Sequence, residues 1–487
     1  MKTMSSEERD AAPTGVSESG PLYASRVKVY PKRIAGTWRL VKWVILVACL
    51  TVYYGGAWLR WDRGPGAPDQ ALLIDLSGRR AYFFNIEIWP QEVYYITGLL
   101  VLAAVGLFFV TSLFGRVWCG YACPQTVWTD LFMLVERWIQ GDRSARIRLD
   151  KSPWSVRKIA LKSATHAAWL LIAAATGGAW VLYFDDAPTV ARQFFTGEST
   201  VGVYFFVGLF TTTTYVLAGW AREQVCTYMC PWPRFQAAML DEHSAAVTYR
   251  AWRGEPRGPI RKNADPAVKT GDCIDCKACV YVCPTGIDIR NGLQIQCIGC
   301  GLCIDACNEI MGKVDRAPNL IAWTSVAAEA ERAQGKPGHY RFVRPRTILY
   351  AALLAVVAAV MVTALALRAT VEVNVLRDRM PQFVLLADGS VRNGYTVKIL
   401  NKARVATTFR IEATGVAGLT LVPSEGAVRD GVVTVVAQPD SVETVPLFLK
   451  GPRGAATEGS HTVTFRVLDE TGRVVARREA VFIGPAK

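Results

Sequence analysis

Five segments of the chain lack Asp, Glu, Lys and Arg over lengths that can cross a membrane. They cover about residues 43–59, 93–115, 163–184, 199–221 and 347–367. A helix of about 22 residues rises roughly 33 Å, more than the roughly 30 Å hydrocarbon core of a bilayer. Trp and Tyr gather at the flanks of these segments, as they do at membrane interfaces. The pattern therefore predicts an integral membrane protein with five transmembrane helices.

The C-terminal part of the chain, from about residue 370, follows a different pattern in which apolar and polar residues alternate. Seven stretches have this period of two: VEVNV, YTVKIL, TTFRIEA, GVVTVVA, ETVPLFL, HTVTFRVLD and VVARREAVFI. Turn-forming pairs such as Asp-Gly and Thr-Gly separate them. Seven short strands in roughly 110 residues are typical of an immunoglobulin-like fold, so an all-β immunoglobulin-like sandwich is predicted here.

The net charge of +14 is concentrated in one set of loops. Basic residues are dense between the second and third apolar segments and include Arg116, Arg137, Arg143, Arg146, Arg148, Lys151, Arg157 and Lys158. The loop at 185–198 instead carries three acidic residues against one Arg. Because loops rich in Lys and Arg stay cytoplasmic, the N-terminus and the 116–158 loop are predicted on the cytoplasmic side of a bacterial inner membrane, and the sandwich is predicted to be periplasmic. No nucleic-acid recognition module accompanies the charge, so no nucleic-acid partner is expected.

These patterns predict a multi-domain membrane protein. The predicted parts are a disordered and basic juxtamembrane N-terminus at 1–36, a four-span membrane domain at 37–258, a ferredoxin domain at 259–316, a connector at 317–345, a fifth transmembrane helix at 346–368 and the sandwich at 369–487. Residues 1–22 are polar and are expected to be disordered. The fold class is thus a five-helix α-helical transmembrane region, an α+β ferredoxin domain of the bacterial dicluster type and an all-β sandwich.

The 13 cysteines, apart from Cys49, fall in segments assigned to the cytoplasmic side or its membrane edge. None lies beyond Cys307. Because cytoplasmic thiols stay reduced, this placement favours metal ligation over a disulfide framework. Cys49 lies in the middle of the first apolar segment and is expected to be a small apolar packing residue.

A doubled Cys-x2-Cys-x2-Cys-x3-Cys run, at 273–286 and 297–308, carries the strongest chemical signal. Such runs ligate two [4Fe–4S] clusters, and the fourth Cys of each run ligates the other cluster. One predicted ligand set is Cys273, Cys276, Cys279 and Cys307, and the other is Cys297, Cys300, Cys303 and Cys283. Zinc competes for any single Cys-x2-Cys pair, but it rarely uses eight cysteines in this doubled spacing.

Two clusters close together form an electron relay, and a relay needs a further group that donates or accepts electrons. There is no Gly-rich dinucleotide fingerprint and no phosphate loop, so neither a flavin nor a nicotinamide is expected. Of four histidines only His166 lies in an apolar segment, whereas a membrane b-type haem normally takes two. His166 is expected to be a hydrogen-bonded packing residue.

Two copies of Cys-x-Tyr-x-Cys-Pro, 107 residues apart, end the second and fourth apolar segments. We call them the first elbow, with Cys119 and Cys123, and the second elbow, with Cys226 and Cys230. On an α-helix, residues four apart share a face, so each thiol pair suits a soft ion such as Cu(I). The following Pro breaks the helix and turns the thiols toward a pocket. The elbows are therefore a candidate metal site of up to four thiolates, and the alternative is that these cysteines only pack.

The layout resembles a known family, the cytochrome c oxidase accessory proteins called CcoG, FixG or RdxA. The resemblance covers nearly the whole chain and rests on KVYPKRIAGTWR, WPQEVYY, GRVWCGYACPQTVW, VCTYMCP, the paired ferredoxin motif, the last apolar segment and the immunoglobulin-like tail. Related membrane polyferredoxins of nitrate and nitrous oxide reduction share the elbows and the cluster motif, but the C-terminal sandwich favours the oxidase branch. The resemblance implies reduction of Cu(II) to Cu(I) for assembly of cbb-type oxidase. It also implies that the elbow cysteines are the copper site, and that oxidase subunits or copper-handling assembly factors are the partners.

Three functions of different classes follow from these observations. The first is a membrane metalloreductase acting on copper, with iron–sulfur clusters as its electron source. The second is a quinol-linked electron-transfer subunit of a respiratory chain. The third is an assembly scaffold in which the clusters are structural. No residue pattern identifies the electron donor or the partner of the sandwich.

Overall fold

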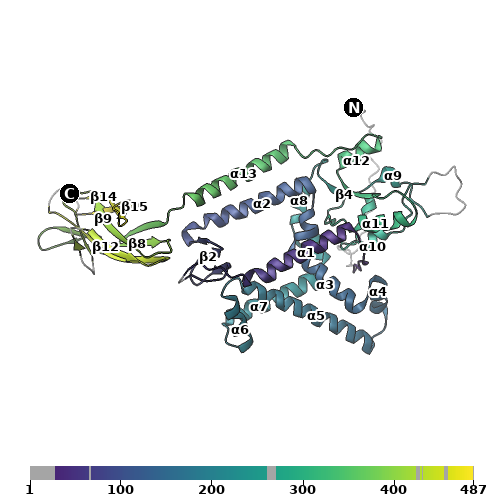
Figure 1. Ribbon diagram of the computed structural model, residues 1–487, viewed down its shortest axis with the longest axis horizontal. Coiled ribbons are helices and arrows are strands. Elements are labelled where there is room, and N and C mark those ends of the chain that lie inside the picture. Colours follow the sequence, from purple (N-terminus) through teal and green to yellow (C-terminus); the bar gives the residue numbers. More distant parts are fainter. Residues whose placement is uncertain are drawn as a thin grey trace, which may run out of the picture. The chain divides into compact units, whose positions relative to one another are not determined.

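The computed structural model describes residues 28–64, 67–259, 270–423, 428–429, 432–453 and 459–485. The chain divides into two compact units, each made of segments far apart in the sequence (Figure 1). Unit 1 comprises Met1–Trp58 and Ala103–Leu354, and unit 2 comprises Leu59–Leu102 and Ala355–Lys487. The stretch 1–22, predicted to be disordered, lies outside the described residues.

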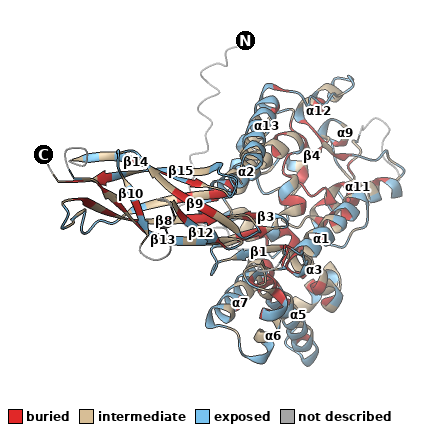
Figure 2. Ribbon diagram, turned by 60° about the vertical axis from the view of Figure 1, so that its left-hand side comes forward, coloured by how far each residue is buried: buried red, intermediate tan, exposed pale blue. Residues whose placement is uncertain are grey.

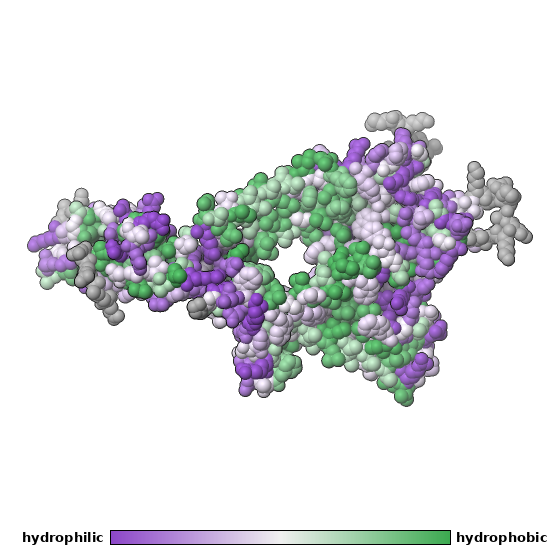
Figure 3. All heavy atoms as spheres, viewed as in Figure 1, coloured by the Kyte–Doolittle hydropathy of each residue, from purple (hydrophilic) through white to green (hydrophobic). Residues whose placement is uncertain are grey.

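Five of the described helices are long and apolar enough to cross a membrane, as the charge-free segments predicted. They cover Thr37–Trp58, Pro90–Phe114, Val156–Val181, Val201–Ala221 and Pro345–Ala366. The first and third begin about two turns before the charge-free segments, because long cationic side chains bury their stems along a helix and keep their charged ends in polar surroundings. Figure 3 shows the hydrophobic surfaces of α2 (Tyr94–Phe114) and α13 (Pro345–Ala366) in green.

The membrane part of unit 1 is a set of packed helices. They are α1 (Thr37–Gly55), α3 (Pro124–Gln140), α4 (Arg143–Lys151), α5 (Val156–Val181), α6 (Ala187–Thr196) and α7 (Val201–Thr214), the last continued by the π-helical η5 (Tyr215–Ala221). A Cβ atom on Gly177 would lie 2.7 Å from the carbonyl oxygen of Val207, so this glycine lets α5 approach α7 closely. Helix α6 replaces a predicted loop: the Asp186 side chain accepts the backbone N–H of Thr189 and caps it.

A two-stranded antiparallel sheet joins the segments that precede and follow the cysteine-rich insert. Strand β4 (Ala246–Tyr249) pairs with β5 (Ile321–Thr324), and both lie outside the predicted bounds 259–316. The strands thus bring the two ends of the cysteine-rich insert together. The helices around them are α8 (Trp232–Met239), α9 (Ala251–Gly254), α10 (Ala278–Val282), η7 (Ile289–Asn291), α11 (Leu302–Lys313) and α12 (Val326–Ala333).

The first span is capped by the ferredoxin segment. Asp305, on α11, accepts the backbone N–H groups of Trp38 (3.3 Å) and Arg39 (2.8 Å). These groups begin α1, where the first N–H groups of a helix have no partner within the helix. A carboxylate between two cluster-motif cysteines, Cys303 and Cys307, therefore completes a membrane helix.

Unit 2 contains the predicted immunoglobulin-like sandwich. Its strands are β6 (Val371–Arg377), β7 (Val384–Leu385), β8 (Val391–Asn401), β9 (Thr407–Thr414), β10 (Thr420–Pro423), β11 (Val428–Arg429), β12 (Val432–Ala437), β13 (Ser441–Gly451), β14 (Ser460–Leu468) and β15 (Val474–Ile483). One sheet has the order β10-β13-β8-β6, with β7 paired to β8, and the other has the order β11-β12-β9-β14-β15. All seven predicted strands are present; β7, β10 and β11 were missed because two to four residues are too short to show alternation. The ribbon of these strands is red in Figure 2 where residues are buried, and these buried residues form the core.

The loop between the first two spans is also folded. Strands β1 (Leu72–Asp75), β2 (Arg80–Phe83) and β3 (Ile86–Ile88) form an antiparallel meander. Arg80 Nη1 lies 2.8 Å from Asp440 Oδ2, which ties β2 to the sandwich. Just beyond the meander, Glu92 Oε1 lies 2.7 Å from Lys402 Nζ. These ion pairs make the loop and the sandwich one unit.

Candidate functional site

The eight thiols of the ferredoxin segment lie in two groups. We name them by their position relative to the first elbow, which contacts the loop of one group. That group is the proximal group and consists of Cys283, Cys297, Cys300 and Cys303. The distal group consists of Cys273, Cys276, Cys279 and Cys307. Burial raises the pKa of Cys307 to about 12, and the charges of the other three distal thiols act in the same direction. Burial likewise raises the pKa of Cys297 to about 12, and the charges of Cys300 and Cys283 add to this effect. Each group thus contains one thiol from the other half of the doubled motif.

Two short helices distribute the thiols between the groups. Helix α10 carries Cys279 of the distal group, and Cys283 of the proximal group follows directly after it. Helix α11 carries Cys303 of the proximal group and Cys307 of the distal group, one helical turn apart. Each helix therefore supplies one thiol to each group. This explains why the fourth cysteine of each run belongs to the group formed mainly by the other run.

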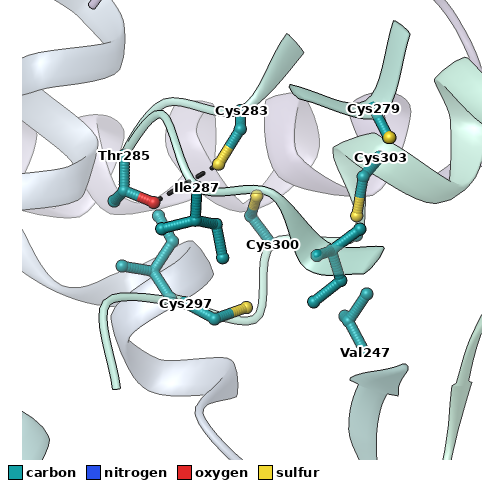
Figure 4. A pocket seen from close by; sticks show the side chains of 11 residues that line it. Val247, Cys279, Cys283, Thr285, Ile287, Cys297, Cys300 and Cys303 are labelled. Carbon is teal, nitrogen blue, oxygen red and sulfur yellow. Dashed lines mark hydrogen bonds between the residues drawn. The ribbon is translucent and has the colours of Figure 1, made fainter. Parts of the chain in front are cut away.

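The proximal group surrounds a small cavity whose wall is otherwise largely apolar. All four of its cysteines line this cavity, together with Cys279 of the distal group and apolar side chains that include Val247 and Ile287. Figure 4 shows the side chains of Cys283, Cys297 and Cys300 pointing toward one another from different parts of the loops. Thiolates are the soft ligands that hold iron–sulfur clusters, and an enclosed apolar wall keeps water away from them. The residues present therefore fit a [4Fe–4S] cluster.

Each elbow is a five-residue π-helical turn, which differs from the predicted α-helical spacing. The turns cover Trp118–Ala122 and Val225–Met229. The N–H of Cys123 donates to the carbonyl of Trp118 (2.9 Å), and the N–H of Cys230 donates to that of Val225 (2.8 Å). Both turns end in extended backbone, because the residue before a proline is kept out of the helical region. Single π-turns are rare and often mark functional sites.

The four elbow thiols share one neighbourhood. Burial raises the pKa of Cys226 to about 12, and the charges of Cys123, Cys119 and Cys230 act in the same direction. Burial also raises the pKa of Cys119 to about 11. In the part of the chain that the structure describes, no three His, Cys, Asp or Glu side chains lie close enough to hold a single metal ion. The elbows thus meet in space, with wider spacing than the ligands of one four-coordinate ion.

The first elbow rests directly on the loop of the proximal group. A Cβ atom on Gly120 would lie 2.9 Å from the carbonyl oxygens of Ile298 and Gly299. The Tyr121 hydroxyl donates to the carbonyl oxygen of Cys300 at 3.0 Å. Cys119 packs in the same apolar cluster as Ile298 and Cys300. Backbone and side chains therefore connect the first elbow to the proximal group without a gap.

The second elbow reaches the proximal loop across a small cavity. Cys226, Glu223 and Met133 line it, and Ile298 and Thr285 from the proximal loops also line it. A thiol, a carboxylate and a thioether thus border the same space. Thiols and thioethers suit Cu(I), whereas carboxylates suit harder ions.

Buried polar side chains support the first elbow. The Cys119 thiol donates to Gln236 Oε1 at 3.0 Å, and Arg116 Nε donates to the same oxygen at 3.3 Å. Sequence reasoning used Arg116 only for membrane orientation and named neither Gln236 nor Gly120. The sequence contains one sign of this contact. The first copy of the motif has Gly120 where the second copy has Thr227, and a glycine permits close approach of another backbone.

The remaining residues singled out from the sequence take structural places. His166 Nδ1 lies 2.9 Å from the Tyr215 hydroxyl, and its ring packs against Trp169, which agrees with the predicted packing role. Cys49 is a partly buried free thiol on α1.

Three family models match this chain. One described as a 4Fe-4S dicluster domain covers residues 221–326, and one described as a 4Fe-4S binding domain covers residues 96–144. A third, described as an IG-like fold at the C-terminal of FixG, covers residues 361–485. These matches agree with the ferredoxin and sandwich predictions, and the segment 96–144 includes the first elbow.

Relatives match along most of the chain. The nitrogen fixation protein FixG of Rhizobium meliloti is 48% identical over 467 residues, which are 90% of this chain and 89% of the relative. Protein RdxA of Cereibacter sphaeroides is 48% identical over 459 residues, 93% of this chain and 96% of the relative. Protein RdxB of the same organism is 48% identical over 408 residues, 83% of this chain and 86% of the relative. The chain therefore belongs to the FixG/RdxA family of iron–sulfur, oxidoreductase-like membrane proteins involved in electron transfer.

Proposed function

We propose that this protein reduces Cu(II) to Cu(I) and thereby serves the assembly of a cbb-type cytochrome c oxidase. The observation that carries the proposal is the direct contact between the first elbow, at Gly120 and Tyr121, and the loop of the proximal group. A thiol-rich site that suits Cu(I) thus touches a site that suits an iron–sulfur cluster.

The cofactor assignment follows the two groups of thiols. The distal group would hold one [4Fe–4S] cluster and the proximal group would hold the other. When bound, these clusters supply one-electron transfer. The four elbow cysteines, Cys119, Cys123, Cys226 and Cys230, are the proposed copper ligands.

Copper enters as a substrate, and the electron balance is simple. Each Cu(II) would take up one electron and become Cu(I), and the clusters, when bound, would supply that electron. Free thiols alone would be consumed as disulfides in this reaction, so electrons that arrive through the proximal group spare them. Cu(I) accepts low coordination numbers, so one elbow pair suffices to retain the product. Glu223 and Met133 line the cavity beside Cys226. They would offer one carboxylate and one thioether to a copper ion next to the second elbow.

The proposed topology places the ferredoxin segment in the cytoplasm and the sandwich in the periplasm of a bacterial inner membrane. The dense positive charge of the loop 116–158 supports this orientation. The sandwich would then face oxidase subunits or copper-handling assembly factors.

The test uses the anaerobically purified, cluster-loaded protein, reduced with dithionite and freed of excess reductant. Stoichiometric Cu(II) is added while cluster absorbance and a Cu(I)-specific chelator are followed together. We expect one Cu(I) for each electron lost by the clusters. A variant with all four elbow cysteines changed to Ser should keep its iron and lose this coupling, whereas Cys49→Ser, outside the elbows, should behave as the native protein. Native behaviour of the fourfold variant would remove the elbows from the reaction.

A quinol-linked electron-transfer subunit is the second candidate. A cavity of about 400 Å³ favours it, because Tyr53, Trp128, Trp180 and Phe210 from the membrane helices line it together with Gln125 beside the first elbow. This size and aromatic lining suit a small apolar ligand. No carboxylate or histidine is among the described residues that line the cavity, so no side chain there accepts the protons that a quinol releases on oxidation. The copper proposal therefore ranks first.

A further inference from the structure

Two arginines beside the distal group are paired with carboxylates. Arg290 forms ion pairs with Asp288 (2.6 Å) and with Asp275. Arg253 lies 2.5 Å from Asp272, the residue before the first distal cysteine. The charge of these arginines is locally compensated, and two other cations of this region, Lys277 and Arg316, are not buried.

The proximal group has a buried cation with neutral partners. Arg116, 8% exposed, donates to the backbone carbonyl of Ile295 and to the amide oxygen of Gln236. A buried guanidinium without an anionic partner is costly, so a nearby negative charge is needed to offset its desolvation. Arg116 lines one cavity together with Cys297 of the proximal group, and a Cβ atom on Gly299 of the same loop would lie 3.6 Å from Arg116 Cβ. With a cluster bound by the proximal group, the anion beside Arg116 would therefore be the thiolate-ligated cluster.

A second buried cation, Lys42, lies near the same group. Lys42 is 2% exposed, and its Nζ lies 3.7 Å from Asp130 Oδ2. That carboxylate also lies 2.8 Å from Arg39 Nη1 and 3.9 Å from Arg137 Nη2. Three cations therefore share one carboxylate, which leaves positive charge in excess. Lys42 lines the same small cavity as Thr285 and Ile298, which belong to the loops of the proximal group.

Two buried carboxylates oppose this positive excess. Glu223 lines the same cavity as Lys42, but Arg222 lines it as well. Asp305 is buried on α11, but its oxygens accept the backbone N–H groups of Trp38 and Arg39 at the start of α1. The positive end of that helix offsets its charge. The surroundings of the proximal group thus stay more positive than those of the distal group.

We propose that Arg116 and Lys42 are the counter-cations of the proximal group, and that they make this site easier to reduce than the distal one. An added electron makes a thiolate-ligated cluster more negative, and a nearby buried cation stabilises that state because the local dielectric is low. Electrons then collect beside the first elbow. The inference rests on the proposed occupancy of both groups by clusters and is independent of copper.

The experiment is a potentiometric titration of the loaded protein, read by visible absorbance and electron paramagnetic resonance, with iron and sulfide content measured in parallel. We expect two potentials in the native protein. Arg116→Gln and Lys42→Met should each lower the higher potential, so that the ratio of reduced to oxidised proximal cluster at a fixed potential falls at least about tenfold, which equals about 59 mV for one electron. The lower potential should stay unchanged, and Lys42→Arg should restore the native value.

Lys313→Met is the matched control, because this lysine lies on α11 of the same segment with a 64% exposed side chain paired to Glu309. It should move neither potential. If Arg116→Gln fails to load iron, Lys42→Met carries the test, since Asp130 keeps Arg39 as its closer partner. Loaded variants with unchanged potentials, or a shift confined to the lower potential, would overturn the inference. Loss of Cu(I) formation with the two potentials in the proposed order would count against the copper proposal alone.

Discussion

The two elbows share one sequence motif and one backbone turn, but their surroundings differ. In the first elbow, Tyr121 is 3% exposed and bonded to the loop of the proximal group. In the second elbow, the matching Tyr228 is 71% exposed, and the neighbouring Met229 is 63% exposed. Each thiol pair closes the same π-turn before a proline. The repeat therefore preserves the geometry of the thiols, while the contacts divide the elbows into one that faces the proximal group and one with an open side.

This difference separates two requirements of an electron-transfer site. Under the proposed function, electron transfer needs close contact with the proximal group, and the first elbow contacts its loop. Exchange of an ion needs access, which the exposed flank of the second elbow offers. One motif used twice thus supplies both requirements without a new fold for either.

The largest expected effect comes from giving the first elbow the residue of the second. Gly120→Thr places a side chain against the carbonyl oxygens of Ile298 and Gly299, and backbone atoms cannot move aside cheaply. We expect a loss of about 3 kcal/mol in the free energy of unfolding. Electron transfer from the clusters to the elbow should fall roughly a hundredfold, because the loop is displaced. Thermal unfolding in detergent and stopped-flow cluster reoxidation measure the two effects.

Thr227→Ala, at the matching position of the second elbow, is the paired control. It removes one hydrogen bond to the carbonyl of Glu223 and introduces no clash. Its unfolding and reoxidation should stay close to native values. Equal damage from both substitutions would show that the elbows are equivalent and would break the comparison.

The tyrosines test the same contrast with a smaller change. Tyr121→Phe removes the hydrogen bond to Cys300 and leaves its carbonyl without that donor. The cost should be about 1 kcal/mol of stability. Tyr228→Phe should change nothing measurable, since that hydroxyl belongs to an exposed side chain. Parallel melting curves of the two variants decide the matter, and a shared shift would mean that exposure does not distinguish the elbows.

The smallest expected effect on the elbows comes from unit 2. Burial, followed by a hydrogen bond to Asp440, raises the pKa of Glu87 from its usual 4.5 to about 7. The folded state therefore binds this proton more tightly than the unfolded state does. The resulting stabilisation is full below pH 4.5 and is lost as the pH rises through about 7. Glu87→Gln should flatten the pH dependence of unit 2 melting between these values.

We expect Glu87→Gln to leave electron transfer at the elbows unchanged. Cluster reoxidation at the first elbow, measured in Glu87→Gln at pH 5 and at pH 8, should follow the native protein. An altered pH profile of reoxidation would mean that unit 2 influences the elbows, and the contrast between them would then have a remote cause.

Local periodicity and spacing made much of the architecture predictable. Charge-free runs located the five spans, because membrane insertion depends on a length of apolar helix. Alternation located seven strands of the sandwich, because each strand has one buried face. The meander β1–β3 was missed because its strands have three or four residues each. Helix α6 was missed although Asp186 and the following Pro188 are helix-start signals.

The surroundings of the site could not be predicted in the same way. Gly120 and Ile298 are 178 positions apart, and no local rule relates them. From the sequence, Arg116 is one of several basic residues in a cytoplasmic loop. Its burial against the neutral oxygens of Gln236 and Ile295 depends on tertiary contacts. The helical spacing of the elbow thiols was wrong in detail, because the proline after each pair ends the helix and the preceding turn widens to π. Spacing indicates which residues bind, whereas tertiary contacts determine what each bound group touches.

The cap on α1 also has a consequence for the timing of biogenesis. The ribosome completes the first membrane helix long before it reaches Asp305, the residue that accepts the first N–H groups of that helix. The start of α1 therefore waits for the ferredoxin segment to be synthesised and folded around its cysteines. A chain that stalls before this point, or that fails to fold the segment, keeps an uncapped first span.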